Sequence, residues 1–206
     1  MDHQLYTLLQ AMEILAILAF ALSGLAEARK QRLDAVGAFI LAFLTAFGGG
    51  TLRDILLDRR PFYWVEHEEY VIVLFVMCVF ATYVLRLVDR VISHRVLIIA
   101  DAIGLGLFSV LGTSLALDMH LPPVTAVIMG VVTGVFGGVL RDVVSNEVPM
   151  IMRGSELYAT CAFIGCWVYL GMYWLDLAAA WSLLGGTATV VGVRLLSLRL
   201  QWQLPR

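Results

Sequence analysis

The sequence predicts an all-α integral membrane protein with seven transmembrane helices, arranged as two inverted three-helix repeats and a seventh helix. The first supporting observation is composition: of the 206 residues, 61% are hydrophobic and only 15% are charged. A soluble domain carries about 25% charged residues, and a chain of this size cannot bury so much apolar surface in one water-soluble core. The net charge of −2 offers no basic surface for nucleic acid. The predicted partner is therefore the lipid bilayer.

Seven apolar segments follow one another along the chain, each close to the roughly 20 residues that a bilayer-spanning helix needs. Their short connections alternate between the two sides of the membrane. The side that holds the N-terminus contains only Arg53, Arg59 and Arg60, and all other basic residues fall on the opposite side. Because cytoplasmic loops are enriched in basic residues, we expect the N-terminus outside and the C-terminus in the cytoplasm of a bacterial or archaeal inner membrane. The predicted spans are residues 9–27, 34–57, 70–88, 96–116, 123–145, 157–175 and 178–197.

The second supporting observation is an internal repeat. The phrase Gly-Gly-Gly-Thr-Leu-Arg-Asp at 48–54 returns 88 positions later as Phe-Gly-Gly-Val-Leu-Arg-Asp at 136–142. The same offset pairs an acid with an acid, at Glu13 and Asp101. Each repeat contains three spans, and three is odd, so the second copy enters the membrane from the opposite side. We expect a first repeat over 1–92, an inverted second repeat over 93–176, and a seventh span with a cytoplasmic tail over 177–206.

Glycine clusters interrupt the second and fifth predicted spans, at Gly48, Gly49 and Gly50 and at Gly137 and Gly138. Each glycine in a helix interior costs about 1 kcal/mol relative to alanine, so a sharp bend or a local unwinding is expected at both clusters. Such interrupted helices often lie on the solute path between inverted repeats. Close helix packing is the alternative use of the same glycines, because small residues let two backbones approach. The sequence leaves both uses open.

An Arg-Asp pair follows each glycine cluster within one helical turn: Arg53 with Asp54, and Arg141 with Asp142. Charged side chains inside a membrane are costly and commonly functional, which favours a role in lining or gating a pathway. A buried structural ion pair explains the same residues equally well. Neighbouring residues on a helix point about 100° apart, so the Arg and Asp of one copy need not pair with each other.

Weaker candidates lie on the first, second, fourth and fifth spans. Glu13 and Asp101 occupy matching positions near the predicted starts of two spans, where the helix macrodipole favours an acid, and the repeat preserves that acid. Hydroxyl side chains could line a narrow polar path, although such groups often bond only their own helix backbone. The candidate hydroxyl residues are Ser23, Thr45, Thr51, Ser109, Thr113 and Thr133.

Enzyme signatures are absent from the sequence. The four histidines lie in tails or loops without metal-ligand spacing on one helix, and no Ser or Cys has the context of a nucleophile. We therefore expect no enzyme activity, no catalytic residue, no metal site and no cofactor.

Seven spans, two inverted three-span repeats and the doubled Gly-Gly-(Thr/Val)-Leu-Arg-Asp motif resemble the prokaryotic trimeric intracellular cation channels, a family that overlaps the group described as glycine transporters. The resemblance covers nearly the whole chain, from Gln10 to the end of the seventh span. It implies a homotrimer with one pore per protomer between the first, second, fourth and fifth spans. That pore would be kinked at the glycine motifs and permeable to monovalent cations, chiefly potassium. Phe136 stands where the first copy has Gly48, and neither the Lys-Glu-Val lipid-binding motif of animal members nor the Thr-Val-Gly-Tyr-Gly filter of potassium channels occurs.

The leading hypothesis is thus a homotrimeric, potassium-permeable cation channel with its pore between the two repeats. A secondary transporter of a small neutral solute such as glycine shares the inverted repeat and the interrupted helices, so it is the alternative. A membrane protein whose charges only hold helices together is a third hypothesis, and it predicts no flux.

Overall fold

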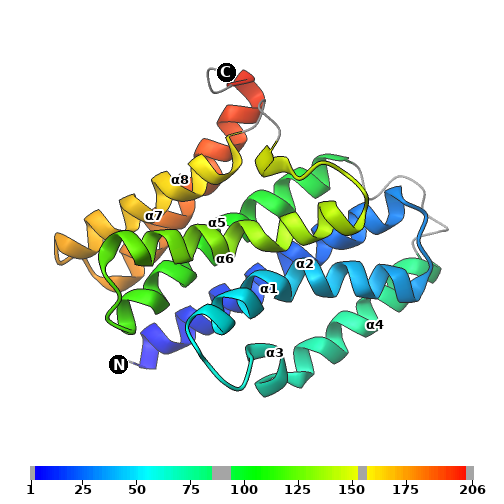
Figure 1. Ribbon diagram of the computed structural model, residues 1–206, viewed down its shortest axis with the longest axis horizontal. Coiled ribbons are helices and arrows are strands. Elements are labelled where there is room, and N and C mark those ends of the chain that lie inside the picture. The colour runs from blue at the N-terminus through cyan, green and yellow to red at the C-terminus, as the bar shows by residue number, and fades with distance from the viewer. Residues whose placement is uncertain (1–2, 85–93, 153–156, 203–206) are drawn as a thin grey trace.

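The chain folds into a bundle of long helices (Figure 1). The computed structural model describes residues 3–84, 94–152 and 157–202. Two short segments, the helix α3 at Tyr63–Glu66 and the 3₁₀ turn η2 at Met150–Met152, come after α2 and α6 respectively. The long helices are α1 His3–Lys30, α2 Ala35–Leu56, α4 Glu68–Val84, α5 His94–Asp118, α6 Pro123–Val144, α7 Tyr158–Trp174 and α8 Ala179–Leu200.

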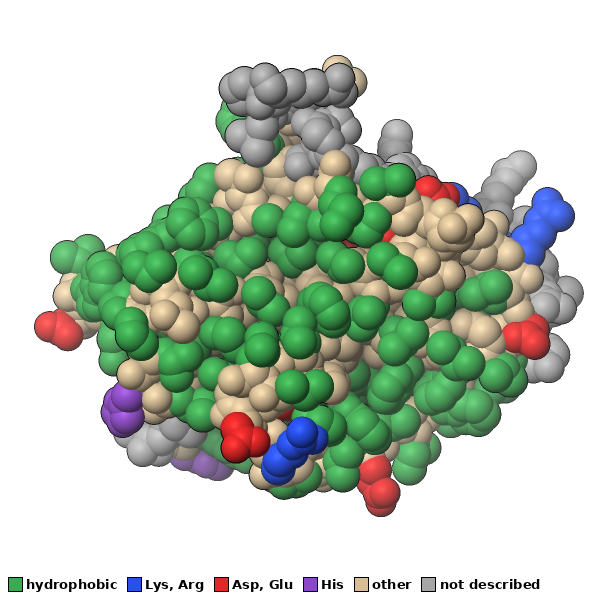
Figure 2. Space-filling view, viewed as in Figure 1, with side chains coloured by type: hydrophobic (Ala, Val, Ile, Leu, Met, Phe, Trp, Pro, Cys, Tyr) green, Lys and Arg blue, Asp and Glu red, His purple; other side chains and the backbone are tan. Residues whose placement is uncertain are grey.

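Within the described residues, 5 helices are long and apolar enough to cross a membrane: α1, α2, α5 from Val96 onward, α6 and α8. They coincide with five of the predicted spans. The predicted spans 70–88 and 157–175 fall on α4 and α7, which have 17 described residues each, and the total of seven spans stays a prediction. Apolar side chains cover much of the face seen in Figure 2, with few charged ones among them. A surface of this kind suits lipid or another apolar partner.

Local sequence signals set the ends of α2 and α6. Asp34 caps α2, and its carboxylate accepts a hydrogen bond from the Gly37 N–H at 2.7 Å, as a helix start favours. α6 begins at Pro123, whose fixed φ suits the first turn and whose missing N–H has no helical partner there. After each helix one residue is left-handed, Asp58 with φ 50° and Asn146 with φ 55°, and Asp and Asn tolerate this region well. Both turn residues and both helix ends are 88 positions apart.

α2 and α6 cross in the middle of the bundle at two glycines. A Cβ atom on Gly49 would fall on the carbonyl oxygen of Thr133, and one on Gly137 would fall on the carbonyl oxygen of Thr45. Each contact is the repeat equivalent of the other, which is the mark of a two-fold relation. Thr45 of α2 lies at Gly137 of α6, and Gly49 of α2 lies at Thr133 of α6. Residue numbers therefore rise along α2 while they fall along α6, so the two helices are antiparallel. This is the relation that an inverted repeat requires.

Both helices are α-helical throughout their glycine clusters. The described segments thus show no local unwinding at Gly48–Gly50 or Gly137–Gly138, and the predicted bend stays a prediction. Close packing explains Gly49 and Gly137, because the backbones approach too closely there for any side chain. The division of the chain into three parts at residues 92 and 176 also stays a prediction.

Four helices, α1, α2, α5 and α6, form the centre of the bundle and position the charged residues. α1 packs against α2 and α5, and α6 packs against α2 and α5. α4 lies beside α2 at one edge, whereas α7 and α8 pack together on the α5–α6 side at the other (Figure 1). Phe20 from α1 and Phe108 from α5, which are repeat equivalents, meet in this centre with their ring centroids 5.4 Å apart.

Candidate functional site

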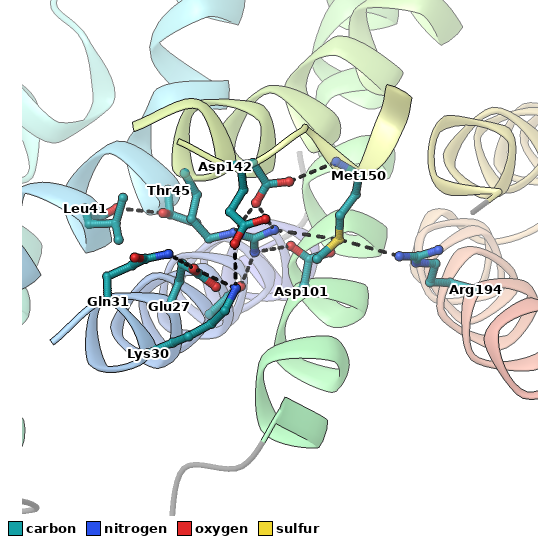
Figure 3. Close-up of polar contacts among 12 residues, drawn as sticks. Glu27, Lys30, Gln31, Leu41, Thr45, Asp101, Asp142, Met150 and Arg194 are labelled. Carbon is teal, nitrogen blue, oxygen red and sulfur yellow. Dashed lines mark hydrogen bonds and ion pairs between the residues drawn. The ribbon is translucent and has the colours of Figure 1, made fainter. Parts of the chain in front are cut away.

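The second repeat holds a fully enclosed arginine. Arg141, in the last turn of α6, has an exposed fraction of 0%. Its Nε and Nη2 atoms each lie 2.9 Å from Asp142 Oδ1, and Nη1 donates to Asp101 Oδ1 on α5 at 2.6 Å. Nη1 also donates to Ser23 Oγ on α1. The Met150 N–H donates to the other Asp142 oxygen at 2.9 Å (Figure 3). These five residues form what we call the second-repeat cluster.

The first repeat holds the equivalent arginine in a more open setting. Arg53 lies in the last turn of α2, and its Nε and Nη2 atoms are each 2.9 Å from Asp54 Oδ1. The nearest Glu13 oxygen, however, is 3.9 Å from Nη2. The Tyr63 N–H donates to Asp54 Oδ2 at 3.4 Å, and burial raises the pKa of the Tyr63 phenol, so its hydroxyl stays protonated. These four residues form the first-repeat cluster.

The same physical effects hold both arginines in place. A cation in the last turn of a helix is favoured by the macrodipole, and a buried guanidinium needs a carboxylate partner. In each copy the adjacent Asp gives one oxygen to the Arg and the other to a backbone N–H of the segment that follows. Arg53 therefore pairs with Asp54, and Arg141 with Asp142, although neighbouring side chains need not meet on a helix.

Glu13 and Asp101 are partners of the two arginines and not helix-start acids. α1 begins at His3 and α5 at His94, and neither helix has an acid in its first turn. The macrodipole explanation drawn from their predicted positions is therefore wrong. Both helices extend beyond the apolar stretch into polar residues, which hydropathy alone does not show. An acid at both positions fits the shared role of balancing a buried guanidinium.

The two clusters differ in the residue that the opposite repeat contributes. Ser23 of the first repeat accepts a hydrogen bond from Arg141 of the second. The position equivalent to Ser23 is Leu111, which lines a cavity beside Arg53 and offers no acceptor. Arg141 thus has a polar cap, whereas the equivalent sequence position in the other repeat is apolar.

A cavity of about 290 Å³ lies beside the first-repeat cluster. Its wall carries charges of both signs, among them the acids Glu13 and Asp118 and the bases Arg53 and Arg59. Because Arg53 is already paired with an Asp, the wall retains acidic character. Such a concave polar site can attract and hold small ions.

A narrower cavity shares Glu13 and Arg53 with the larger one. It extends along Gly50 and Thr51 to Phe108. Phe108 packs against Phe20, whose exposed fraction is 0%. Two apolar rings therefore lie at the inner side of this cavity.

Four of the candidate hydroxyls bond their own helix backbone. Thr45, Thr51, Thr113 and Thr133 each donate to the carbonyl oxygen four residues earlier, which satisfies the hydroxyl locally. Thr51 also lines the narrower cavity, and Ser109 is fully buried. A pore-lining role for this set stays a prediction.

Two further glycines leave room beside the clusters. A Cβ atom on Gly138 would lie 2.8 Å from the Tyr158 hydroxyl oxygen and 3.6 Å from Asp101 Oδ1. The equivalent atom on Gly50 would lie 3.8 Å from Arg53 Nη2, which is ordinary contact. The second-repeat cluster is therefore the more tightly packed of the two around its glycine.

One buried arginine was missed by the sequence reasoning. Arg194 of α8 has an exposed fraction of 2% and its guanidinium carbon lies 4.9 Å from the centre of the Tyr158 ring. Its Nη2 and that of Arg141 are each 3.7 Å from Met150 Sδ (Figure 3). The available signal was an arginine inside the predicted span 178–197, since charge there is costly.

A second missed contact ties the two repeats together near the second-repeat cluster. Lys30 Nζ, at the end of α1, lies 3.2 Å from Glu27 Oε1 and 3.1 Å from Glu147 Oε1 (Figure 3). Glu147 follows α6, so this contact joins the first helix of one repeat to the second helix of the other. No group of three or more His, Cys, Asp or Glu side chains in the described part of the chain could hold a metal ion.

Fold and clusters together define a class: an all-helical, multi-pass membrane protein built from a repeated helical unit with a buried arginine in each copy. A family profile described as "Glycine transporter" matches the chain twice, over residues 10–86 and 98–174. The UPF0126 inner membrane protein YadS of Escherichia coli (strain K12) is 38% identical, over 94% of this chain and 93% of its own length. A UPF0126 membrane protein of Vibrio cholerae is 34% identical, over 97% of this chain and 82% of its own length.

Solved structures of membrane proteins are also similar to this chain over nearly its whole length. The TRIC trimeric intracellular cation channel orthologue from Rhodobacter sphaeroides matches with a TM-score of 0.88 and 32% identity, over 95% of this chain and 100% of that one. A structure described as showing the basis for conductance through TRIC cation channels matches with a TM-score of 0.83 and 36% identity, over 96% of each chain. The chain belongs to this family of prokaryotic trimeric intracellular cation channels, which overlaps the glycine transporter family.

Proposed function

We propose that this protein is a homotrimeric, potassium-permeable cation channel with one pore per protomer between its two repeats. The observation that carries the proposal is the match, over 95% of the chain with a TM-score of 0.88, to a structure described as a trimeric intracellular cation channel orthologue. The apolar surface supports residence in a membrane and contact with other protomers.

The wall of the larger cavity supports a route for cations. Glu13, Glu66 and Asp118 line it, and acids in a concave site raise the local concentration of cations. Arg53 also lines it, but the Asp54 carboxylate at 2.9 Å balances its charge. A cation that enters here meets carboxylates and a guanidinium that is already paired.

The phenylalanine pair between the repeats is the constriction in this proposal. Replacing Phe108 by Ala removes one of the two rings and is expected to raise the single-channel current or the open probability. Phe163→Ala is the matched control, because Phe163 lies on α7 and is 45% exposed. Currents in planar bilayers measure both variants, and equal currents from Phe108→Ala and the unsubstituted protein would exclude this constriction.

The direct test is a single-channel recording under asymmetric potassium and sodium. Purified protein is expected to give unitary cation currents, and its reversal potential gives the preference for potassium. Native mass spectrometry in the same detergent measures the oligomer, for which three copies are expected. A silent protein across voltages and lipids would refute the channel proposal.

Secondary transport of a small neutral solute such as glycine is the second candidate. The observation that favours it is the difference between the two ends, with a cavity beside Arg53 and a fully enclosed Arg141. Alternating access produces such a difference. Glycine uptake that saturates with concentration, without unitary currents, would decide for this candidate.

We further propose that the protein resides in the inner membrane with its N-terminus outside. The support is the distribution of basic residues among the predicted loops. Protease protection of a tag at each terminus in intact cells tests this orientation, and a protected N-terminal tag would reverse it.

A further inference from the structure

We propose that Arg59 and Asp118 form a latch that closes over the cavity beside Arg53, as the counterpart of the Lys30–Glu147 contact at the other end. The proposal rests on the proposed passage of a solute between the repeats, since a latch matters only if something passes. In this proposal, the contact between Arg59 and Asp118 determines whether the cavity is open or closed.

The two pairs occupy equivalent positions with their charges exchanged. Asp118 is the second-repeat equivalent of Lys30, and these residues end α5 and α1. Arg59 is the first-repeat equivalent of Glu147. The N–H groups of Arg59 and Glu147 each donate, at 2.8 Å, to the carbonyl oxygen of the Asp in the adjacent cluster. The backbone therefore presents both pairs in the same way, with the opposite sign of charge on each helix end.

The two pairs differ in whether they are joined. Lys30 Nζ lies 3.1 Å from Glu147 Oε1. Arg59 and Asp118 both line the cavity of about 290 Å³, and no ion pair between them occurs among the residues that the structure describes. Lys30 and Glu147 are thus joined at one end, whereas at the other end the corresponding pair is apart around a cavity.

The two arginine clusters show the same difference, because the arginine–acid contact is also tighter at the end where Lys30 and Glu147 are joined. Arg141 contacts Asp101 at 2.6 Å, whereas Arg53, beside the cavity, is 3.9 Å from Glu13. Two copies of one structural unit can exchange conformations, and in an inverted repeat this exchange turns an open end into a closed one, as in the alternating access of the second candidate function. After such an exchange, the charged pair at the cavity meets and the pair at the other end separates.

A cysteine at the cavity wall reports whether the latch is closed. Ser114 lines the cavity, and the Ser114→Cys variant can be modified by a charged thiosulfonate reagent in purified protein in detergent, where both ends are accessible. The native Cys78, Cys161 and Cys166 are buried, and the unsubstituted protein supplies the background rate. Leu115→Cys, at the same wall, is a second reporter if Ser114→Cys impairs folding.

Four variants on this reporter separate the latch from general effects. Lys30→Met removes a contact of the present conformation and is expected to slow modification roughly two- to fivefold, the range that an exposed ion pair supplies. Adding Asp118→Asn to Lys30→Met removes the latch acid and is expected to restore the rate. Adding Arg59→Asp together with Asp118→Arg to Lys30→Met keeps a pair of opposite charges at the cavity. Modification of this variant is expected to stay as slow as in Lys30→Met alone. Adding Glu66→Gln, the matched control at the same wall, also leaves it slow.

An unchanged rate in Lys30→Met overturns the proposal, and so does a rescue by Glu66→Gln equal to that by Asp118→Asn. The second outcome would mean that Arg59 closes onto another acid or that general charge controls access. These rates require no flux. A protein with this labelling pattern but no current or uptake contradicts the proposed function alone, and a conducting protein without the pattern contradicts the latch alone.

Discussion

Arg53 and Arg141 hold equivalent places at the ends of α2 and α6, and each pairs with the following Asp at 2.9 Å. Beyond that pair their surroundings differ. Arg141 contacts Asp101 at 2.6 Å and is capped by Ser23. Arg53, in contrast, lies 3.9 Å from Glu13 and borders a cavity. The shared part of each cluster comes from the duplicated motif itself. The part that differs comes from side chains that other helices supply, so these side chains decide how enclosed each charge is.

The largest expected difference between the clusters lies in their acids. Asp101→Asn leaves Arg141 buried with one carboxylate fewer, and breaking a buried pair in this way costs on the order of 3–5 kcal/mol. Glu13→Gln is expected to cost less than about 1 kcal/mol, because a longer and partly exposed contact is worth little. Thermal unfolding of both variants in detergent measures the comparison. Equal losses would show that the two clusters are energetically equivalent despite their geometry.

The cap on Arg141 gives the next effect. Ser23→Ala makes the second-repeat cluster resemble the first, and losing a hydrogen bond to a charged group costs about 1.5–3 kcal/mol. Ser109→Ala is the matched control, because the buried Ser109 hydroxyl has no hydrogen-bond partner in the described residues. Removing an unsatisfied buried hydroxyl is expected to be neutral or stabilising. Similar losses in the two variants would argue against the cap.

The smallest expected difference between the repeats tests what they share. Gly49→Ala and Gly137→Ala each place a methyl group against a carbonyl oxygen of the opposite repeat, and overpacking of this kind costs about 1–3 kcal/mol. The two losses are expected to be equal, because the contacts are repeat equivalents. Gly50→Ala is the control, since its Cβ has space and alanine favours a helix by about 1 kcal/mol. Unequal losses at Gly49 and Gly137 would break the two-fold relation between α2 and α6.

Much of the fold follows from the sequence because its signals are local. Apolar stretches locate α1, α2, α5, α6 and α8, and the offset of 88 recurs in the ends of α2 and α6 and in the two matches to the family profile. The charged candidates also lie where the offset places them, one cluster in each repeat. Hydropathy failed at the ends of α1 and α5, because a helix continues into polar residues that no apolar window includes.

The site was harder to predict because its contacts are not local. The pairing of Arg53 with Asp54 depends on how one side chain folds back over its neighbour, which helix periodicity does not specify. The role of Arg194 depends on the approach of α8 to Tyr158 and Met150. The glycines could serve bending or packing by composition alone, and the close approach to Thr133 and Thr45 shows packing at Gly49 and Gly137.

The sequence by itself determined the duplication, the membrane-spanning segments and the positions of the buried charges, since each of these is written in short stretches of chain. The tertiary structure alone decided how each of the two arginines is enclosed. Ser23 of the first repeat accepts a hydrogen bond from Arg141, whereas Leu111 of the second repeat only lines the cavity that Arg53 also lines. The physical reason is that enclosure depends on distances between helices, where a difference between 2.6 Å and 3.9 Å separates a tight ion pair from an open one.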